Sequence, residues 1–87
     1  MDLRQLRYFV TVAENGHVTR AAQILGMQQP PLSQQIKALE ADLGLQLLTR
    51  HARGVSLTQA GERLLIDARR LIADFEALRT RMADVAG

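Results

Sequence analysis

The sequence contains no cysteine and no tryptophan, and only one tyrosine and two phenylalanines among its 87 residues. Without cysteine the chain can form neither a disulfide nor a thiolate metal site. It also lacks an apolar run near the roughly 20 residues that a membrane-spanning helix needs, and its first residues lack the apolar core of a signal peptide. We therefore expect a soluble cytoplasmic protein with no membrane partner. Its 87 residues are enough for one hydrophobic core and too few for two.

Acidic residues are missing from two long windows. No aspartate or glutamate occurs at positions 15–39 or 43–61, and the cations inside these windows are Arg20, Lys37, Arg50 and Arg53. From position 58 to the end, five basic and five acidic residues cancel. The net charge is only +2, but the positive charge is concentrated in the first two thirds of the chain. This uneven distribution favours a polyanion as the partner of that part.

Positions 28–40 predict a helix with two different faces. Pro31 suits a first helical turn, where its missing N–H has no intrahelical partner. The apolar residues recur at helical spacing and define a buried stripe: Leu32, Ile36, Leu39 and Leu43. The opposite face offers neutral donors, neutral acceptors and one cation: Gln29, Pro30, Ser33, Gln34 and Lys37. Such a face suits the edge of a polyanion.

Two helices are predicted before this one. The first covers positions 2–15 and ends at Gly16, and a short second helix covers Val18–Leu25 and ends at Gly26. Two helices joined by a glycine turn, with Ala22 four residues before that glycine, have the layout of a helix-turn-helix. Many small helical bundles share this spacing, so a bundle without DNA binding remains the alternative at this point.

After Gly44, the segments 45–50 and 55–58 predict short extended runs that flank a polar turn at 51–54. A β-hairpin behind a helix-turn-helix is a wing. Arg53 at its tip suits the minor groove or a phosphate, because it combines a long stem with a fixed charge. The alternative is a solvated loop arginine. Arg50 and His51 are each either a phosphate contact or a surface residue.

The last segment predicts a long helix capped by the Thr58 hydroxyl. Gly61 in its first turn costs roughly 1 kcal/mol relative to alanine, which suggests that another backbone passes close by. At ~1.5 Å per residue the helix extends about 40 Å, farther than the small domain can cover. We expect its first two turns to pack on the first helix and the rest, beyond about Leu71, to pair with a second copy of the chain. The predicted dimer residues follow a heptad pattern: Leu64, Ala68, Leu71, Ile72, Phe75, Leu78, Met82 and Val85.

The inventory of side chains argues against an enzyme. His17 and His51 are the only histidines, and neither has a carboxylate or a nucleophile at a useful spacing. Most acidic residues lie in the last helix, interleaved with arginines, as in Asp67 with Arg70, which is typical of a solvated helix face. We expect no catalytic residue, cofactor or metal. A winged-helix interaction module that does not bind DNA is a further alternative, which the acid-free face disfavours.

Five motifs resemble the DNA-binding domain of LysR-type transcriptional regulators, and the likeness covers the whole chain. They are Leu3-Arg4-x-Leu6-x-Tyr8-Phe9, Thr19-Arg20-Ala21-Ala22, Gln29-Pro30-Pro31-Leu32-Ser33-x-x-Ile36-x-x-Leu39-Glu40, Leu43-Gly44-x-x-Leu47-Leu48-x-Arg50 and Leu57-Thr58-x-Ala60-Gly61. Arg-Tyr-Phe followed by Gln-Pro-Pro-Leu-Ser is most similar to the regulators of aromatic-compound degradation operons.

The resemblance implies a mainly α fold: a winged helix-turn-helix of three helices and a two-stranded β wing at 1–57, then a long linker and dimerisation helix at 58–87. It implies a bacterial protein of the nucleoid that binds an interrupted palindrome in double-stranded DNA as a homodimer. The recognition helix, about 30–42, would enter the major groove and the wing at 51–54 the minor groove. The effector-binding domain, through which a small-molecule inducer would act, is expected to be absent from this chain, and the full-length protein is expected to form higher oligomers.

The resemblance also assigns base contacts to Gln29, Pro30, Ser33, Gln34 and Arg53, and Pro31 and the phosphate contacts complete the expected set. The expected base contacts are Gln29, Pro30, Pro31, Ser33, Gln34 and Arg53, and the expected phosphate contacts are Thr19, Arg20, Gln28, Lys37, Arg50 and His51. Two positions depart from the family pattern. Gln34 stands where similar members often carry arginine, which puts a guanine-reading contact in doubt. His17 stands where serine or asparagine usually caps the second helix, which leaves that cap open.

Overall fold

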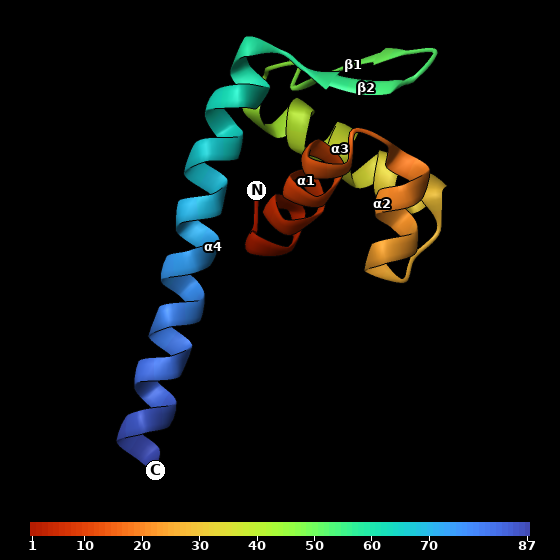
Figure 1. Cartoon of the computed structure of the whole chain (residues 1–87). Coiled ribbons are helices and arrows are strands. Elements are labelled where there is room, and N and C mark those ends of the chain that lie inside the picture. The colour runs from red at the N-terminus through yellow and green to blue at the C-terminus, as the bar shows by residue number, and fades with distance from the viewer.

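The computed structural model describes residues 1–87 as four helices and one two-stranded antiparallel sheet. The elements, in chain order, are α1 (Leu3–Asn15), α2 (Val18–Leu25), α3 (Gln29–Leu43), β1 (Leu48–His51), β2 (Gly54–Leu57) and α4 (Gln59–Ala86). In Figure 1, α1, α2 and α3 gather under the hairpin, and the C-terminal part of α4 extends well beyond them. The mainly α, winged helix-turn-helix architecture with a long last helix is confirmed. None of the four helices is long and apolar enough to cross a membrane.

Local signals set the helix ends. Gly16 and Gly26 end α1 and α2, each in the left-handed conformation at φ 66° and 67°. Side-chain caps begin α1 and α4: the Asp2 carboxylate accepts from a backbone N–H of α1 at 2.8 Å, and the Thr58 hydroxyl accepts from Gly61 N–H at 3.0 Å. The predicted Thr58 cap is therefore confirmed.

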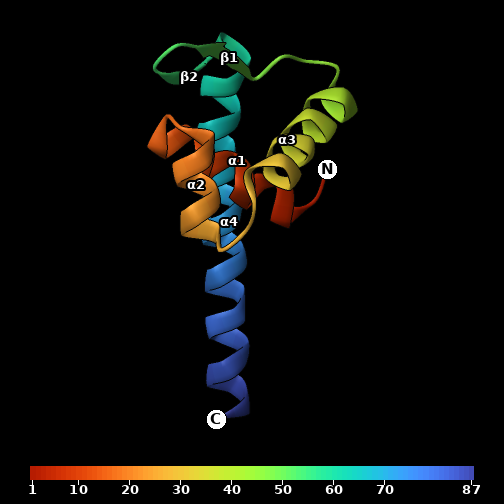
Figure 2. The same ribbon diagram turned by 90° about the vertical axis from the view of Figure 1, so that its right-hand side faces the viewer.

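One hydrophobic core joins α1, α2 and α3 to the hairpin. Its buried members are Phe9, Val12, Val18, Ala21, Ala22, Leu32, Ile36, Leu39, Leu47, Leu48 and Val55. The stripe predicted for α3 supplies three of them, and its last member, Leu43, packs partly buried against the cluster. Because α3 buries this stripe, its polar face points away from the core. In Figure 2, α3 lies at the side of the molecule next to α1.

The hairpin is shorter than the sequence predicts. β1 begins at Leu48, and residues 45–47 form the loop after α3 rather than strand. The Glu40 carboxylate accepts from the N–H groups of Leu47 at 2.7 Å and Leu48 at 3.3 Å, so these amides bond to α3 instead of a partner strand. The expected four-residue turn at 51–54 is also too long, because His51 pairs with Gly54 and only Ala52 and Arg53 connect the strands.

The hairpin rests on the turn between α1 and α2. Val55 N–H donates to the Gly16 carbonyl at 3.0 Å. Gly54, at φ 134°, lies so close that a Cβ there would stand 2.1 Å from the Gly16 carbonyl oxygen. This contact fixes the wing, defined here as residues 48–57, on the helix-turn-helix.

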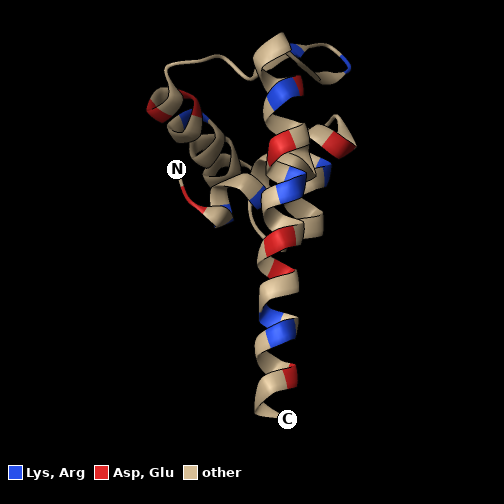
Figure 3. Ribbon diagram, turned by 90° about the vertical axis from the view of Figure 1, so that its left-hand side faces the viewer, with Lys and Arg blue, Asp and Glu red and all other residues tan.

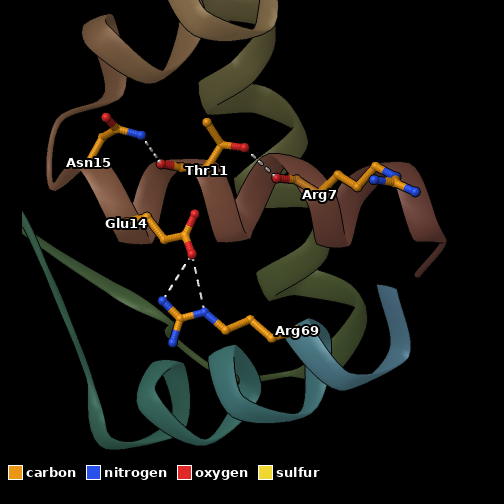
Figure 4. Close-up of polar contacts among 5 residues, drawn as sticks. All are labelled: Arg7, Thr11, Glu14, Asn15 and Arg69. Carbon is orange, nitrogen blue, oxygen red and sulfur yellow. Dashed lines mark hydrogen bonds and ion pairs between the residues drawn. The ribbon is translucent and has the colours of Figure 1, made fainter. Parts of the chain in front are cut away.

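Two ion pairs connect α1 to α4. Arg69 donates from Nη2 and Nε to the Glu14 carboxylate at 3.0 and 3.2 Å, as Figure 4 shows, and Arg7 pairs with Glu76. Thr11 and Asn15, drawn beside them, donate to carbonyls of α1 itself. Glu14, near the end of α1, pairs with Arg69, which precedes Glu76 in α4. The two helices therefore run in opposite directions, with the same number of residues between the two ion pairs on each helix. All four ion-pairing side chains are substantially exposed, so each pair contributes little to stability.

Other charged contacts lie on the surface. Among the interleaved charges of α4, Asp67 pairs with Arg63 one turn earlier at 3.1 Å. The N-terminal amine of Met1 donates to the Asp42 carboxylate at 2.6 Å, which joins the start of the chain to the end of α3. This hydrogen bond raises the pKa of the amine above its ordinary value.

Candidate nucleic-acid interface

The outward face of α3 carries the residues that were predicted to read a polyanion. Pro30, Pro31, Gln34 and Lys37 are exposed, and Gln29 and Ser33 are half-buried. The helix begins at residue 29 and ends at 43, close to the predicted 30–42. The face is polar and free of carboxylates, so it can offer donors and acceptors to a base edge without repelling phosphate.

A cleft lies where α2, α3 and the wing meet. Its lining residues are His17, Val18, Thr19, Gln29, Arg50, His51, Ala52, Gly54 and Val55. Four predicted contacts therefore come together from three elements: Thr19, Gln29, Arg50 and His51. The other predicted contacts lie outside this lining: Arg20, Gln28, Pro30, Pro31, Ser33, Gln34, Lys37 and Arg53. His17 is a lining residue that was not predicted as a contact, and only its place at the start of α2 could have indicated it.

A hydrogen bond joins the wing to α3 beside this cleft, and a second one within α3 shares its acceptor. Arg50 Nη2 donates to Ser33 Oγ at 3.1 Å, and Gln29 Nε2 donates to the same oxygen at 2.6 Å. A strand residue and a helix residue thus meet on one hydroxyl. The arrangement holds three predicted contact residues in one place.

His51 organises the wing turn. Its Nδ1 accepts from Arg53 N–H at 3.2 Å, so in the neutral ring Nε2 carries the proton and donates to Ser56 Oγ at 2.8 Å. Both ring nitrogens are occupied within the wing. The geometry gives His51 a positioning role beside Arg53, while its contact with a phosphate stays a prediction.

The two helices at the cleft begin without a side-chain cap. His17 and Gln28 are the N-cap residues of α2 and α3, and neither side chain bonds to the free amides behind it. The question left open by His17 is thereby answered: it does not replace a serine cap. Free N–H groups and the helix dipole make such ends favourable for phosphate oxygens.

Charge is distributed as the sequence predicts. In Figure 3 the wing carries basic segments and no acidic one. Glu40, the acidic residue that ends the first acid-free window, is hydrogen-bonded to the amides of Leu47 and Leu48. Positions 15–39 and 43–61 contain no carboxylate. These positions supply the start of α2, the outward face of α3 and the wing, so the surface that they form is free of carboxylates.

The apolar stripe of α4 is mostly uncovered. Its exposed members are Leu71, Phe75, Leu78, Met82 and Val85, and from Ala73 onward every residue of the helix is exposed. The expectation that Ala68 contacts a second chain is wrong, because Ala68 has no exposed surface in the single chain. Ala68 directly precedes Arg69, which pairs with Glu14 of α1. Leu64, another predicted dimer residue, packs against the domain core.

A comparison with known protein families decides the identity of this surface. The model described as "Bacterial regulatory helix-turn-helix protein, lysR family" matches residues 3–62. The chain belongs to the LysR family. It carries that family's DNA-binding winged helix-turn-helix together with a long C-terminal helix, so the resemblance predicted from the motifs is confirmed at the level of the family.

Individual LysR relatives match over nearly the whole chain. The transcriptional regulator BudR of Klebsiella aerogenes is 51% identical over 86 residues, covering 99% of this chain and 60% of the relative. ClcR of Pseudomonas putida is 53% identical over 81 residues, covering 93% of this chain and 28% of the relative. The chain thus spans only part of these relatives. The crystal structure of the BenM DNA-binding domain with catB site 1 DNA superimposes with a TM-score of 0.97 at 41% identity, covering 100% of this chain and 98% of that one.

Proposed function

We propose that this LysR-family chain reads specific base pairs in double-stranded DNA, with α3 in the major groove and the wing in the adjacent minor groove. The observation that carries the proposal is the meeting of the uncapped α2 start, the polar α3 face and the wing at one carboxylate-free surface. The BenM domain, which shares this fold at 41% identity, was solved as a DNA complex. Helix width and polar chemistry suit the major groove, and the long Arg53 side chain suits the narrower minor groove.

Contacts follow from position on this surface. The proposed base contacts are Gln29, Pro30, Pro31, Ser33, Gln34 and Arg53. The proposed phosphate contacts are Thr19, Arg20, Gln28, Lys37, Arg50 and His51. Thr19 and Arg20 lie in the first turn of α2 and Gln28 at the start of α3, beside free amides that attract phosphate. Lys37 and Arg50 supply positive charge without specificity.

A homodimer through α4 completes the proposal, with residues 1–57 as the DNA-binding unit and 58–87 as the dimerisation helix. At 3.6 residues per turn, the stripe from Leu71 to Val85 lies about 180° around α4 from Arg69 and Glu76, the residues that pair with α1. The helix α1 therefore cannot cover the stripe. A second α4 can, and two joined DNA-binding units would suit an interrupted palindrome.

The setting of this activity belongs to the proposal as well. We place the chain in the bacterial cytoplasm, at the nucleoid, where an operator is available. Because the chain spans 60% of BudR and 28% of ClcR, any response to a small-molecule inducer is assigned to residues outside this chain, as is any assembly beyond the dimer.

Selection from random duplexes with the 87-residue chain tests DNA binding directly. We expect a defined half-site motif. We also expect an apparent affinity that falls by at least about tenfold between roughly 50 and 200 mM salt, because the release of counterions from DNA gains less free energy at higher salt. An interaction module that does not bind DNA would select no motif. Salt-dependent DNA binding without a selected motif would contradict the reading of bases and would leave only binding to the phosphate backbone.

Gln34→Arg tests the placement of α3. Glutamine offers one donor and one acceptor, which complement the N6 and N7 positions of adenine, whereas arginine offers a fork to guanine O6 and N7. We expect the substitution to shift one half-site position toward guanine by roughly 1–3 kcal/mol and to leave the positions read by Gln29 and Ser33 unchanged. Parallel selections at one salt concentration provide the measurement.

The matched control is Gln23→Arg, which adds the same charge to an exposed position of α2. It should strengthen binding equally for all sequences or leave it unchanged. Identical selected bases for the parent chain and Gln34→Arg would mean that position 34 does not read sequence and that α3 lies in the groove by another face.

A further inference from the structure

One hydroxyl in the interface has both of its acceptor positions occupied. Ser33 Oγ receives a hydrogen bond from Gln29 Nε2 at 2.6 Å and another from Arg50 Nη2 at 3.1 Å. A serine hydroxyl has one proton to donate and two lone pairs that accept. With both lone pairs used inside the protein, only the proton remains for an outside partner.

The chemistry of the partners fixes the direction of these bonds. A guanidinium has donors and no acceptor, so Arg50 can only donate to Ser33. Gln29 donates through its amide nitrogen, which leaves its carbonyl oxygen and second N–H for a base edge. Arg50 also keeps further N–H groups for a phosphate, so an interaction with Ser33 does not exclude the phosphate contact proposed above.

The wing cannot easily withdraw Arg50 from this bond. Glu40 binds the amides of Leu47 and Leu48 at the start of β1, and it lies two helical turns, about 10 Å, beyond Ser33 on the same helix. β1 is therefore attached to α3 at both points. At the other strand, the Val55 amide bonds to the Gly16 carbonyl, which holds the hairpin against the helix-turn-helix.

We propose that Arg50 is a specificity-positioning residue: together with Gln29 it makes the Ser33 hydroxyl an obligate donor. The group to which Ser33 then donates is a hydrogen-bond acceptor of the major groove, namely guanine N7 or O6, adenine N7 or thymine O4. The amino groups of cytosine and adenine are rejected, because they are donors. This inference rests on the proposed reading of DNA by α3 and adds the chemical class of the group that Ser33 recognises.

The experiment compares base selection by the parent chain, Ser33→Ala, Arg50→Ala, Arg53→Ala and the Ser33→Ala/Arg50→Ala double variant. The position that loses its preference in Ser33→Ala identifies the base facing Ser33. At that position we expect an acceptor in the parent, and a loss of roughly threefold to tenfold in discrimination for Arg50→Ala. Adding Arg50→Ala to Ser33→Ala should change that position no further, because the two residues act as one unit.

Arg53→Ala is the matched control, since it removes the same charge from the same wing without touching Ser33. It should reduce affinity while leaving the Ser33 position unchanged. Equal weakening at every position in Arg50→Ala would make Arg50 a plain phosphate contact and overturn the inference, as would selection of an amino donor opposite Ser33 in the parent. If the parent selects no motif at all, the proposed function fails first. Thermal melts of each variant verify that the domain is folded.

Discussion

Replacing both Leu71 and Leu78 with aspartate is expected to give a folded monomer whose affinity for a two-half-site operator falls by about 100-fold or more. In the single chain these side chains are 51% and 47% exposed, so the domain core loses little when they become polar. In the proposed dimer they are buried, and an unpaired buried carboxylate is strongly unfavourable. Losing the dimer removes the high effective concentration of the second half-site.

Sedimentation and operator titration measure the two effects separately. The control variant carries Thr80→Asp and Ala83→Asp, which add the same charge to the opposite face of α4, beyond the reach of α1. It should remain dimeric and keep its operator affinity. A Leu71→Asp/Leu78→Asp variant that sediments like the parent would show that this stripe does not hold two chains together.

Gly61→Ala is expected to lower the free energy of unfolding by about 3 kcal/mol or more. A Cβ at this position would stand 2.1 Å from the Leu47 carbonyl oxygen. The oxygen cannot move freely, because it accepts from Thr58 N–H at 3.0 Å. Helix propensity alone predicts the opposite sign, since alanine is roughly 1 kcal/mol better than glycine inside a helix. The sign of the change therefore shows which effect dominates.

Urea unfolding of the parent, Gly61→Ala and Gln59→Ala provides the measurement. Gln59 is exposed in the same helical turn, so its replacement by alanine should change stability by less than about 0.5 kcal/mol. A Gly61→Ala variant as stable as the parent would mean that the loop before β1 shifts to admit a methyl group.

Local patterns were sufficient for most of the fold. The glycines that end α1 and α2, the Thr58 cap and the buried stripe of α3 all depend on residues within a few positions of each other, where backbone conformation and helical period determine the outcome. Even the close approach at Gly61 was predicted, because a glycine in a first helical turn opposes helix propensity and so indicates a long-range contact. The motifs identified the family for a similar reason, because each motif is a short run of residues that can be recognised without knowing how distant segments pack.

The tertiary structure decided how distant segments meet. The Glu40 carboxylate shortens β1 by binding the amides of Leu47 and Leu48, and Arg50 meets Ser33 across 17 positions of sequence; neither contact follows from periodicity. Ala68 has the same heptad spacing as Leu71, yet it is fully buried in the single chain while Leu71 is half exposed. Periodicity determines which side chains share a helix face, whereas the packing of α1 on α4 determines which part of that face is already covered and which part is left for a second chain.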